Sequence, residues 1–276
     1  METIKISVII PSYKPQNYLW ECLESIQVQT MPQEEFEVIL ILNGCREPYS
    51  KAIESFISKH PAGNLTMLQT DIPGVSNARN MGIDNARGEF LTFIDDDDYI
   101  SPTYLQELYN IAKDGITPVS NVIAFNHVTG QYETNYLTEC YKHLYNKDKI
   151  TIMQARSFMS VPVAKILSTN AIGIRRFDPE FKVGEDGLFM FQISNRIKIL
   201  KAASPSCVYY RRNRDGSAIN SLRPRGQRLK NNFKLMTNYT KYYLQDIRHY
   251  NIFFYISRLV AEMISMTFAV RGKIQQ

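Results

Sequence analysis

The stretch that decides the fold is Glu89-Phe90-Leu91-Thr92-Phe93-Ile94, and it runs directly into Asp95-Asp96-Asp97-Asp98. The first six residues are mostly apolar, which predicts a buried strand. In an open α/β sheet, ligands bind beyond the carboxyl ends of the strands. Four adjacent carboxylates repel one another, so folding them together calls for a cation. The stretch therefore predicts a binding site at a sheet edge, with a solvated acidic turn as the alternative.

Strands and helices alternate on both sides of this stretch. The predicted strands are residues 5–10, which Pro11 ends, 36–42, 65–69, 121–126 and 207–211. The predicted helices are residues 18–28, 49–58, 74–86 and one that Pro102 starts. This alternation predicts an α/β fold with a doubly wound, mostly parallel sheet flanked by helices.

The composition is that of a globular protein, with 276 residues, 44% hydrophobic and 21% charged. The four cysteines form no CxxC pair and no secretion signal precedes them, so we expect free thiols and a cytoplasmic protein. The four histidines have no HExxH or similar spacing, which disfavours a zinc site.

The net charge of +5 conceals an asymmetry along the chain. Residues 201–276 hold 14 Lys and Arg against 3 Asp and Glu, and the pattern after Pro224 is helical. Residues 250–270 are mostly apolar, but Arg258 and Glu262 among them argue against a membrane-spanning helix. Such a segment suits peripheral contact with an anionic membrane or a place in the core, and no recognition motif favours nucleic acid.

The aspartate run offers oxygen ligands alone, without a nearby His or Cys, which suits Mg²⁺ or Mn²⁺. These ions usually keep one or two protein carboxylates and complete their shell with substrate phosphates. Arg79 lies in the helix that precedes the aspartate strand. An arginine beside a metal can neutralise a diphosphate by bidentate contact.

Three segments together resemble family 2 glycosyltransferases. They are Val8-Ile9-Ile10-Pro11-Ser12-Tyr13, then Gly74-Val75-Ser76-Asn77-Ala78-Arg79-Asn80-Met81-Gly82, then residues 86–98 with the aspartate run. The family patterns are VIIPTYN, ARN-x-G, A-x-G-x-Y/F and F-L-D-x-D-D, and the matches cover about residues 5–105. The resemblance implies a GT-A fold, a nucleotide-diphosphate sugar as donor, a UDP-sugar first among them, and Mn²⁺ or Mg²⁺ as cofactor.

The resemblance also implies roles for individual residues. Tyr13 would pack against the nucleobase, with Pro11 and Ser12 shaping the pocket, and Arg79 would reach the nucleotide. In the D-x-D motif, Asp96 would lie near the ribose, Asp97 would bind the metal and Asp95 would support them.

One departure concerns the base pocket. Where the family usually has two aspartates after the second strand, this chain has Ile41-Leu42-Asn43-Gly44-Cys45. Leu42 stands in the position of the aspartate that commonly contacts the base. Asn43 or backbone groups are the expected substitutes, which leaves the identity of the base open.

An inverting transfer needs a carboxylate that takes the proton from the acceptor hydroxyl. Gly184-Glu185-Asp186 resembles the family's G-E-D-x-x-F/L motif, and Phe177-Asp178-Pro179-Glu180-Phe181 matches its lead-in. The resemblance makes Asp186 the base, and Glu185 would contact the acceptor or hold the helix start. Asp also favours helix N-termini on its own account, and the two interpretations are compatible.

Residues 209–217 resemble the family's Y-R-x-x-x-x-S segment. Arg212 and Ser217 would then close over the diphosphate; a mobile basic loop is an equal alternative. We expect residues 1–115 to form a nucleotide-sugar-binding half, 116–222 an acceptor-binding and catalytic-base half, and 223–276 a basic helical extension.

Other classes are disfavoured by missing motifs. No GxGxxG follows the first strand, and no P-loop or EF-hand series is present. A processive polysaccharide synthase would carry Q-x-x-R-W, but the single tryptophan is Trp20. We therefore expect transfer of one sugar in cell-surface polysaccharide synthesis, with a glycan or polyprenyl-diphosphate-linked glycan as acceptor. A catalytically inactive nucleotide-sugar-binding homologue remains the alternative.

Overall fold

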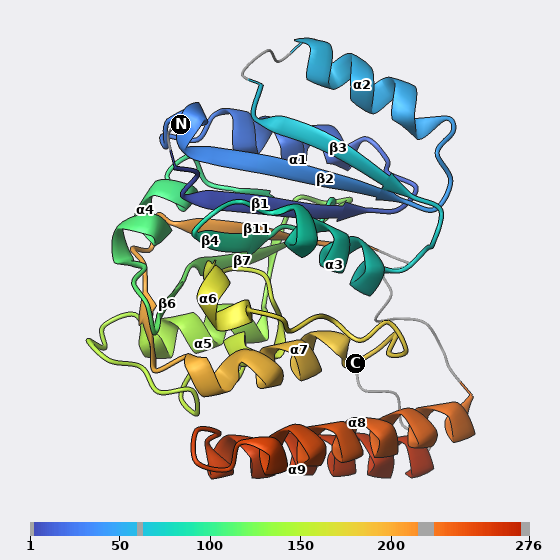
Figure 1. Ribbon diagram of the computed structural model, residues 1–276, viewed down its shortest axis with the longest axis vertical. Coiled ribbons are helices and arrows are strands. Elements are labelled where there is room, and N and C mark those ends of the chain that lie inside the picture. The colour runs from blue at the N-terminus through green and yellow to red at the C-terminus, as the bar shows by residue number, and fades with distance from the viewer. Residues whose placement is uncertain (1–2, 60–62, 215–223, 272–276) are drawn as a thin grey trace.

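The computed structural model describes residues 3–59, 63–214 and 224–271 of the chain. Its main sheet has the strand order β3-β2-β1-β4-β9 (Figure 1). These strands are β1 Ile6–Ser12, β2 Phe36–Asn43, β3 Leu65–Thr70, β4 Phe90–Phe93 and β9 Leu167–Ser168. All neighbours are parallel except β4 and β9. The predicted doubly wound, mostly parallel sheet is confirmed.

The strand order reverses between β1 and β4, which is the switch point where open α/β sheets bind ligands. The loops that follow β1 and β4 begin at this point. β1 is buried along its whole length, as its apolar composition predicts. Its boundary was predicted wrongly, because the strand continues through Pro11 to Ser12. β4 pairs with β1 only as far as Ile9, so Pro11 faces a single neighbouring strand and its missing N–H is tolerated.

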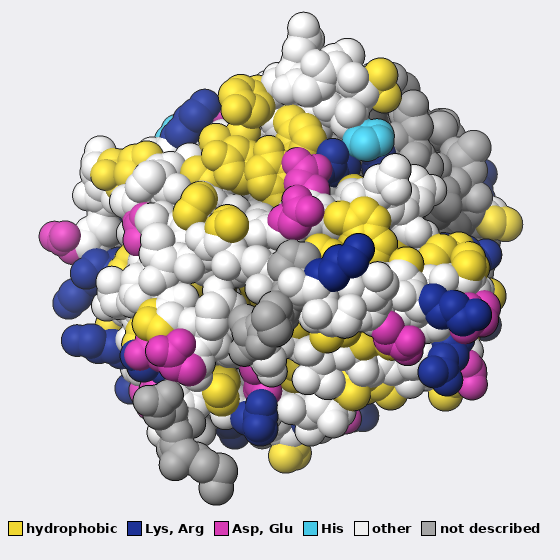
Figure 2. Space-filling model, turned by 90° about the horizontal axis from the view of Figure 1, so that it is seen from above, with side chains coloured by type: hydrophobic (Ala, Val, Ile, Leu, Met, Phe, Trp, Pro, Cys, Tyr) yellow, Lys and Arg dark blue, Asp and Glu magenta, His cyan; other side chains and the backbone are white. Residues whose placement is uncertain are grey.

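Helices lie against this sheet at the predicted places. They are α1 Tyr18–Gln27, α2 Tyr49–Lys59, α3 Val75–Asn85 and α4 Tyr104–Ile111. α3 packs against β1 and β2, which places its polar residues beside the loop after β1. Figure 2 looks down on the α2 end of the molecule, where acidic and basic side chains are interspersed and apolar ones gather in one area.

A second layer lies below the main sheet in Figure 1. Its four-stranded sheet has the order β5-β11-β7-β8, and β10 pairs with β6 beside it. The strands are β5 Tyr99–Ile100, β6 Ile116–Val119, β7 Asn121–Asn126, β8 Tyr132–Glu133, β10 Ile199–Ala202 and β11 Val208–Asn213. The helices are α5 Tyr136–Leu144, α6 Thr169–Ile172 and α7 Glu185–Ile193, with short 3-10 turns at Gln33–Glu35, Phe158–Ser160 and Ser194–Arg196. β5 and β11 pair, so the aspartate loop is tied directly to this layer.

The chain ends in a helical hairpin, α8 Arg225–Gln245 and α9 Ile252–Arg271, which lies below α7 in Figure 1. The hairpin joins the core through Phe191 of α7, whose ring lies 5.2 Å from Tyr239, 5.0 Å from Tyr250 and 5.7 Å from Phe254 between centroids. Within the described residues, none of the helices combines the length and hydropathy that a membrane-spanning helix needs. The four cysteines are free thiols, as expected.

Candidate active site

A cleft of about 940 Å³ opens at the switch point. It collects residues from the ends of β1, β2 and β11, the start of α3, the aspartate loop and the start of α7. The predicted site residues on its wall are Pro11, Tyr13, Asn43, Arg79, Asp95, Asp96, Asp97, Glu185, Asp186 and Arg212. The volume is ample for a nucleotide sugar, since small-molecule sites usually span about 300–1,000 Å³.

The aspartate loop is held by a different partner at each position. Asp96 is buried and accepts a hydrogen bond from Ser12 Oγ at 2.6 Å. Asp98 is buried and accepts from Tyr209 Oη and from the backbone N–H of Arg212, both at 2.7 Å. Burial raises the pKa of Asp96 to about 7 and that of Asp98 well above its usual value. Ser12 thus acts through Asp96, because its hydroxyl is not among the groups on the cleft wall.

Asp97 faces the cleft and already has a cationic partner. Its Oδ2 lies 2.5 Å from Arg214 Nε, and the Arg214 guanidinium lies 4.8 Å over the ring of Tyr18. Burial and the neighbouring Asp95 raise the Asp97 pKa, and the contact with Arg214 opposes that rise. In this structure the positive charge beside the Asp97 carboxylate comes from Arg214.

Arg79 joins the two halves of the cleft. Its Nη2 contacts Asp95 Oδ1 at 2.9 Å, and its Nη1 contacts Asp186 Oδ1 at 2.6 Å. Only 4% of the Arg79 side chain is exposed, and its guanidinium lies 5.3 Å over the ring of Phe177. The two carboxylates hold the Arg79 pKa above its usual value against the effect of burial. Arg79 thus lies at the cleft, with both of its terminal nitrogens bound to carboxylates of the protein.

Asp186 lies in the first turn of α7, which Gly184 precedes with a left-handed φ of 87°. The Asp186 carboxylate remains 28% exposed toward the cleft. Burial raises its pKa, and Arg79 partly offsets the rise. Lys165, fully buried nearby, has its pKa lowered by burial to about 7, and it donates to the carbonyls of Val161 and Val163 at 2.7 and 2.6 Å.

The loop after β1 presents Tyr13, which is half exposed at the mouth of the cleft. Its ring lies against Gly44, where a Cβ would be only 2.8 Å from the ring. Asn43 is buried, donates to Ser12 O at 2.7 Å and accepts from Gly74 N at 3.0 Å. The Asn43 amide therefore fixes the β1 loop against α3, and Leu42 is fully buried.

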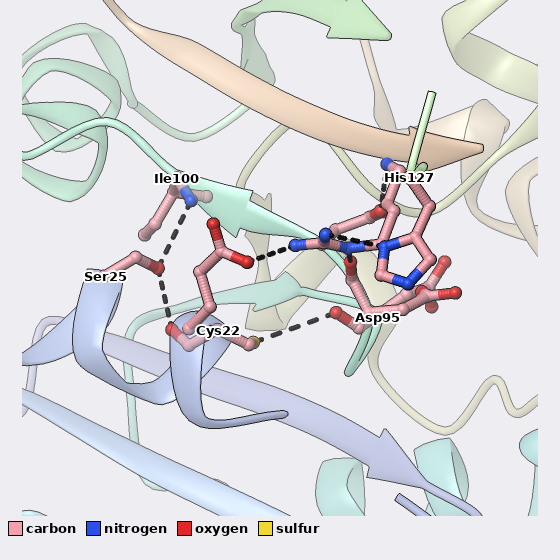
Figure 3. Close-up of polar contacts among 9 residues, drawn as sticks. Cys22, Ser25, Asp95, Ile100 and His127 are labelled. Atoms are coloured by element: carbon pink, nitrogen blue, oxygen red, sulfur yellow. Dashed lines mark hydrogen bonds and ion pairs between the residues drawn. The ribbon is translucent and has the colours of Figure 1, made fainter. Parts of the chain in front are cut away.

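Arg212 lies over the aspartate loop from the β11 side. Its Nε donates to Asp97 O at 2.7 Å, Nη1 lies 3.1 Å from His127 Nδ1, and its Nη2 pairs with Glu21. Figure 3 shows His127 in this network and, beside it, the thiol of Cys22, which donates to Asp95 O at 3.8 Å. On the α1 side, Ser25 accepts a hydrogen bond from Ile100 N at 3.3 Å. Ser217 lies outside the described residues.

Arg214 and Glu21 were not among the predicted site residues. Arg214 directly follows the end of β11, two residues after Arg212, and this closeness in sequence was the one signal for it. Glu21 had none, since its contact with Arg212 depends on how α1 packs against β11.

Across the described ranges, His, Cys, Asp and Glu form no group of three that could ligate a metal ion. Within the aspartate loop, the most exposed carboxylates on the cleft wall are Asp95, with 39% of its side chain exposed, and Asp97, with 17%. Asp96 and Asp98 are bound to Ser12 and Tyr209.

The sheet order, the switch-point cleft and its carboxylates define a protein of the GT-A class. Residues 7–174 match the model of glycosyl transferase family 2, and the chain belongs to this family. The family prediction is thereby confirmed.

Among curated relatives, the chain is 27% identical over 223 residues to the poly(ribitol-phosphate) beta-N-acetylglucosaminyltransferase TarS of Staphylococcus aureus, covering 79% of this chain and 37% of that protein. It is 29% identical over 195 residues to the glycosyltransferase GlyA of Streptococcus pneumoniae, covering 66% of this chain and 27% of GlyA. The chain thus spans about a third of the length of these relatives.

Among solved structures, S. aureus TarS 1-349 in complex with UDP-GlcNAc superposes with a TM-score of 0.73 at 21% identity, covering 96% of this chain and 73% of that one. A mannosyltransferase from Pyrobaculum calidifontis in complex with GDP-Man and Mn²⁺ superposes with a TM-score of 0.64 at 14% identity. The match covers 97% of this chain and 73% of that one. At these identities the likeness establishes the fold.

Proposed function

We propose that this chain transfers one sugar from a nucleotide-diphosphate sugar to an acceptor hydroxyl with inversion at the anomeric carbon. The observation that carries the proposal is the placement of Asp186 and the aspartate loop on one guanidinium, that of Arg79. A candidate base and a candidate diphosphate site thereby share one cleft.

In the proposed reaction, the acceptor oxygen attacks the anomeric carbon as the bond to the diphosphate oxygen breaks. The hydroxyl proton passes to the Asp186 carboxylate, and the nucleoside diphosphate leaves. A base works best when its pKa lies near the working pH, and burial raises the Asp186 pKa in that direction. Arg79 opposes this rise and fixes the direction of the carboxylate through the 2.6 Å contact.

We assign the donor nucleotide to the Tyr13 side of the cleft. The half-exposed Tyr13 ring offers a face for a nucleobase, and Pro11 and Asn43 lie on the same wall. A UDP-sugar is the donor we favour, because the superposed TarS structure contains UDP-GlcNAc. The Asn43 amide is bound to backbone groups, so its contribution would be to hold the loop that carries Tyr13.

Asp97 is the residue we propose as ligand for Mn²⁺ or Mg²⁺, with Asp95 beside it. Both are oxygen donors exposed to the cleft, and such ions complete their shell with phosphate oxygens. A bound divalent ion would stabilise the charge that develops on the leaving diphosphate. Arg214 would leave Asp97 for the diphosphate, and Arg212 lies close enough to assist.

For the acceptor we propose a glycan, or a glycan linked to polyprenyl diphosphate, that serves cell-surface polysaccharide synthesis. The support comes from relatives whose names describe teichoic acid and poly(ribitol-phosphate) chemistry. Glu185 lies on the cleft wall beside Asp186, where an acceptor hydroxyl would have to approach.

We further propose that the C-terminal hairpin contacts an anionic membrane on the cytoplasmic side. The exposed side chains of α9 between residues 252 and 264 are all apolar: Ile252, Phe253, Ile256, Val260, Met263 and Ile264. α8 carries five basic residues and no acidic one. An apolar helix face beside basic residues suits the headgroup region of an anionic bilayer.

Sedimentation with vesicles that contain phosphatidylglycerol tests the membrane contact. Ile256→Glu should reduce binding, whereas Val128→Glu, which also introduces a glutamate at an exposed aliphatic residue but in the turn between β7 and β8, should not. Equal binding of both variants and the wild type would contradict the proposed contact.

The main experiment is a donor screen that measures transfer and donor hydrolysis with and without Mn²⁺. An active enzyme releases nucleoside diphosphate from one donor class, and release rises with an acceptor glycan. Donor binding without any turnover would instead identify a catalytically inactive nucleotide-sugar-binding protein.

A further inference from the structure

The turn that presents Asp186 packs against the C-terminal hairpin; we call this packing contact the seat of the turn. Gly184 stands just before α7 with its left-handed φ of 87°, and a Cβ there would lie 2.5 Å from Leu235 Cδ1. Leu235 belongs to α8 and is 1% exposed. The side chain of Leu235 therefore packs directly on the backbone of the turn, in space that only a glycine leaves open.

Gly187, which follows Asp186, also packs against the hairpin. A Cβ on Gly187 would lie 3.1 Å from Tyr239 Oη of α8 and 3.6 Å from Arg258 Nη1 of α9. The two glycines enclose Glu185 and Asp186, so both ends of the dipeptide rest on the hairpin while its carboxylates face the cleft.

Polar contacts fix the same arrangement. Asn231 Nδ2 donates to Val183 O at 3.1 Å, immediately before the turn. Arg258 is buried and donates from Nη1 to Ser160 Oγ at 3.0 Å and from Nη2 to Met159 O, which anchors α9 to the core. The hairpin is thus held on the core independently of the contacts that it makes with the turn.

We propose that Leu235 and Tyr239 are positioning residues for Asp186, and that the α8–α9 hairpin is a necessary part of the catalytic unit. This inference rests on the proposed transferase function. A base must lie within hydrogen-bond reach of the acceptor hydroxyl, and a shift of about 1 Å can cost about 100-fold in rate. Loosening the seat should therefore lower kcat and leave donor binding intact, because Tyr13 and Asp97 lie on other segments.

The first test compares Leu235→Ala with Leu259→Ala. Leu259 lies in the same hairpin, packs against the core and is not among the atoms nearest to either glycine. We expect kcat to fall about 10-fold or more in Leu235→Ala with an unchanged KM for the donor, and Leu259→Ala to stay within about 3-fold of the wild type. Equal losses in the two variants would overturn the proposal.

A milder pair covers the case in which Leu235→Ala does not fold. Gly187→Ala places a methyl group 3.1 Å from Tyr239 Oη, and Tyr239→Phe removes that oxygen. We expect Gly187→Ala to lower kcat and the Gly187→Ala/Tyr239→Phe double variant to recover most of the loss. A purely structural role of Tyr239 predicts additive losses, and additivity would refute the positioning role.

Hydrogen exchange separates this inference from the proposed function. Amides of residues 183–190 should exchange faster when the seat is loosened in Leu235→Ala, and keep wild-type rates in Leu259→Ala. If the wild type transferred no sugar, the proposed function would fail, and this comparison would still decide whether the hairpin holds the turn. Unchanged exchange in Leu235→Ala would show that Leu235 does not hold the turn in place.

Discussion

Arg79 and Asp186 lie 107 residues apart in the sequence and are joined by a contact of 2.6 Å between Nη1 and Oδ1. The other terminal nitrogen of the same guanidinium holds Asp95, the second residue after the β4 strand. The pair connects the start of α7 with the aspartate loop through one nearly buried side chain. Any movement of Arg79 would therefore disturb the proposed base and the proposed diphosphate site together.

The first prediction concerns stability. Arg79→Met should lower the free energy of unfolding by about 3 kcal/mol, because it removes a nearly buried cation and leaves two partly exposed carboxylates, Asp95 and Asp186, unpaired. Chemical denaturation measures this difference. Arg176→Met is the matched control, since its ion pair with Asp84 is at the surface, with 33% and 58% exposure, and should contribute about 1 kcal/mol or less. Similar losses in both variants would show that Arg79 has no special structural role.

The second prediction concerns the base. Asp186→Asn should keep the affinity for nucleotide and lower kcat by about 100- to 10,000-fold, since the amide still accepts from Arg79 but takes no proton. Single-turnover transfer and calorimetric UDP binding measure the two effects. Asp178→Asn serves as control, because Asp178 lies in the same lead-in segment and does not line the cleft. Activity within a few-fold of the wild type would exclude Asp186 as the base.

The sequence predicted those parts of the molecule that depend on local pattern. β1, β4 and α3 follow from buried runs and helical spacing, and the aspartates that follow β4 predict a ligand site at its carboxyl end. β9 was missed, because two residues paired antiparallel with β4 leave no periodic signal.

The hydrogen-bond and ion-pair partners of the site residues could not be predicted from the sequence, for a different reason. Asp97 was predicted to face a metal, and its contact with Arg214 spans 117 residues. Asn43 was predicted to face the base, and its hydrogen bonds to Ser12 and Gly74 require β1, β2 and α3 to be already packed. The spacing of motifs in the sequence indicates which residue types gather at the edge of the sheet. Which side chains pair there depends on how the helices and strands pack in three dimensions.

The third prediction concerns the metal. Asp97→Asn should abolish the gain in UDP affinity that Mn²⁺ confers, because a neutral amide is a weak ligand for a hard cation. Titration calorimetry with and without excess Mn²⁺ measures the gain. Asp71→Asn removes one exposed carboxylate away from the cleft wall and should leave the gain unchanged. An undiminished Mn²⁺ effect in Asp97→Asn would remove this residue from the proposed metal site.

The fourth prediction concerns pH and Lys165. Burial lowers its pKa from 10.5 to about 7, so between these values the unfolded chain binds more protons at this residue than the folded protein does. The contribution of Lys165 to stability is therefore full above pH 10.5 and is lost as the pH falls through 7, with a slope of up to about 1.4 kcal/mol per pH unit. Lys165→Met should remove this slope. Urea denaturation at pH 7.5, 8.5 and 9.5 measures it in both proteins, and Lys198→Met, at a side chain outside the core, should retain the wild-type slope. If Lys165→Met kept the wild-type slope, the buried ammonium would be charged throughout this range, and the carbonyls of Val161 and Val163 would suffice to hold it.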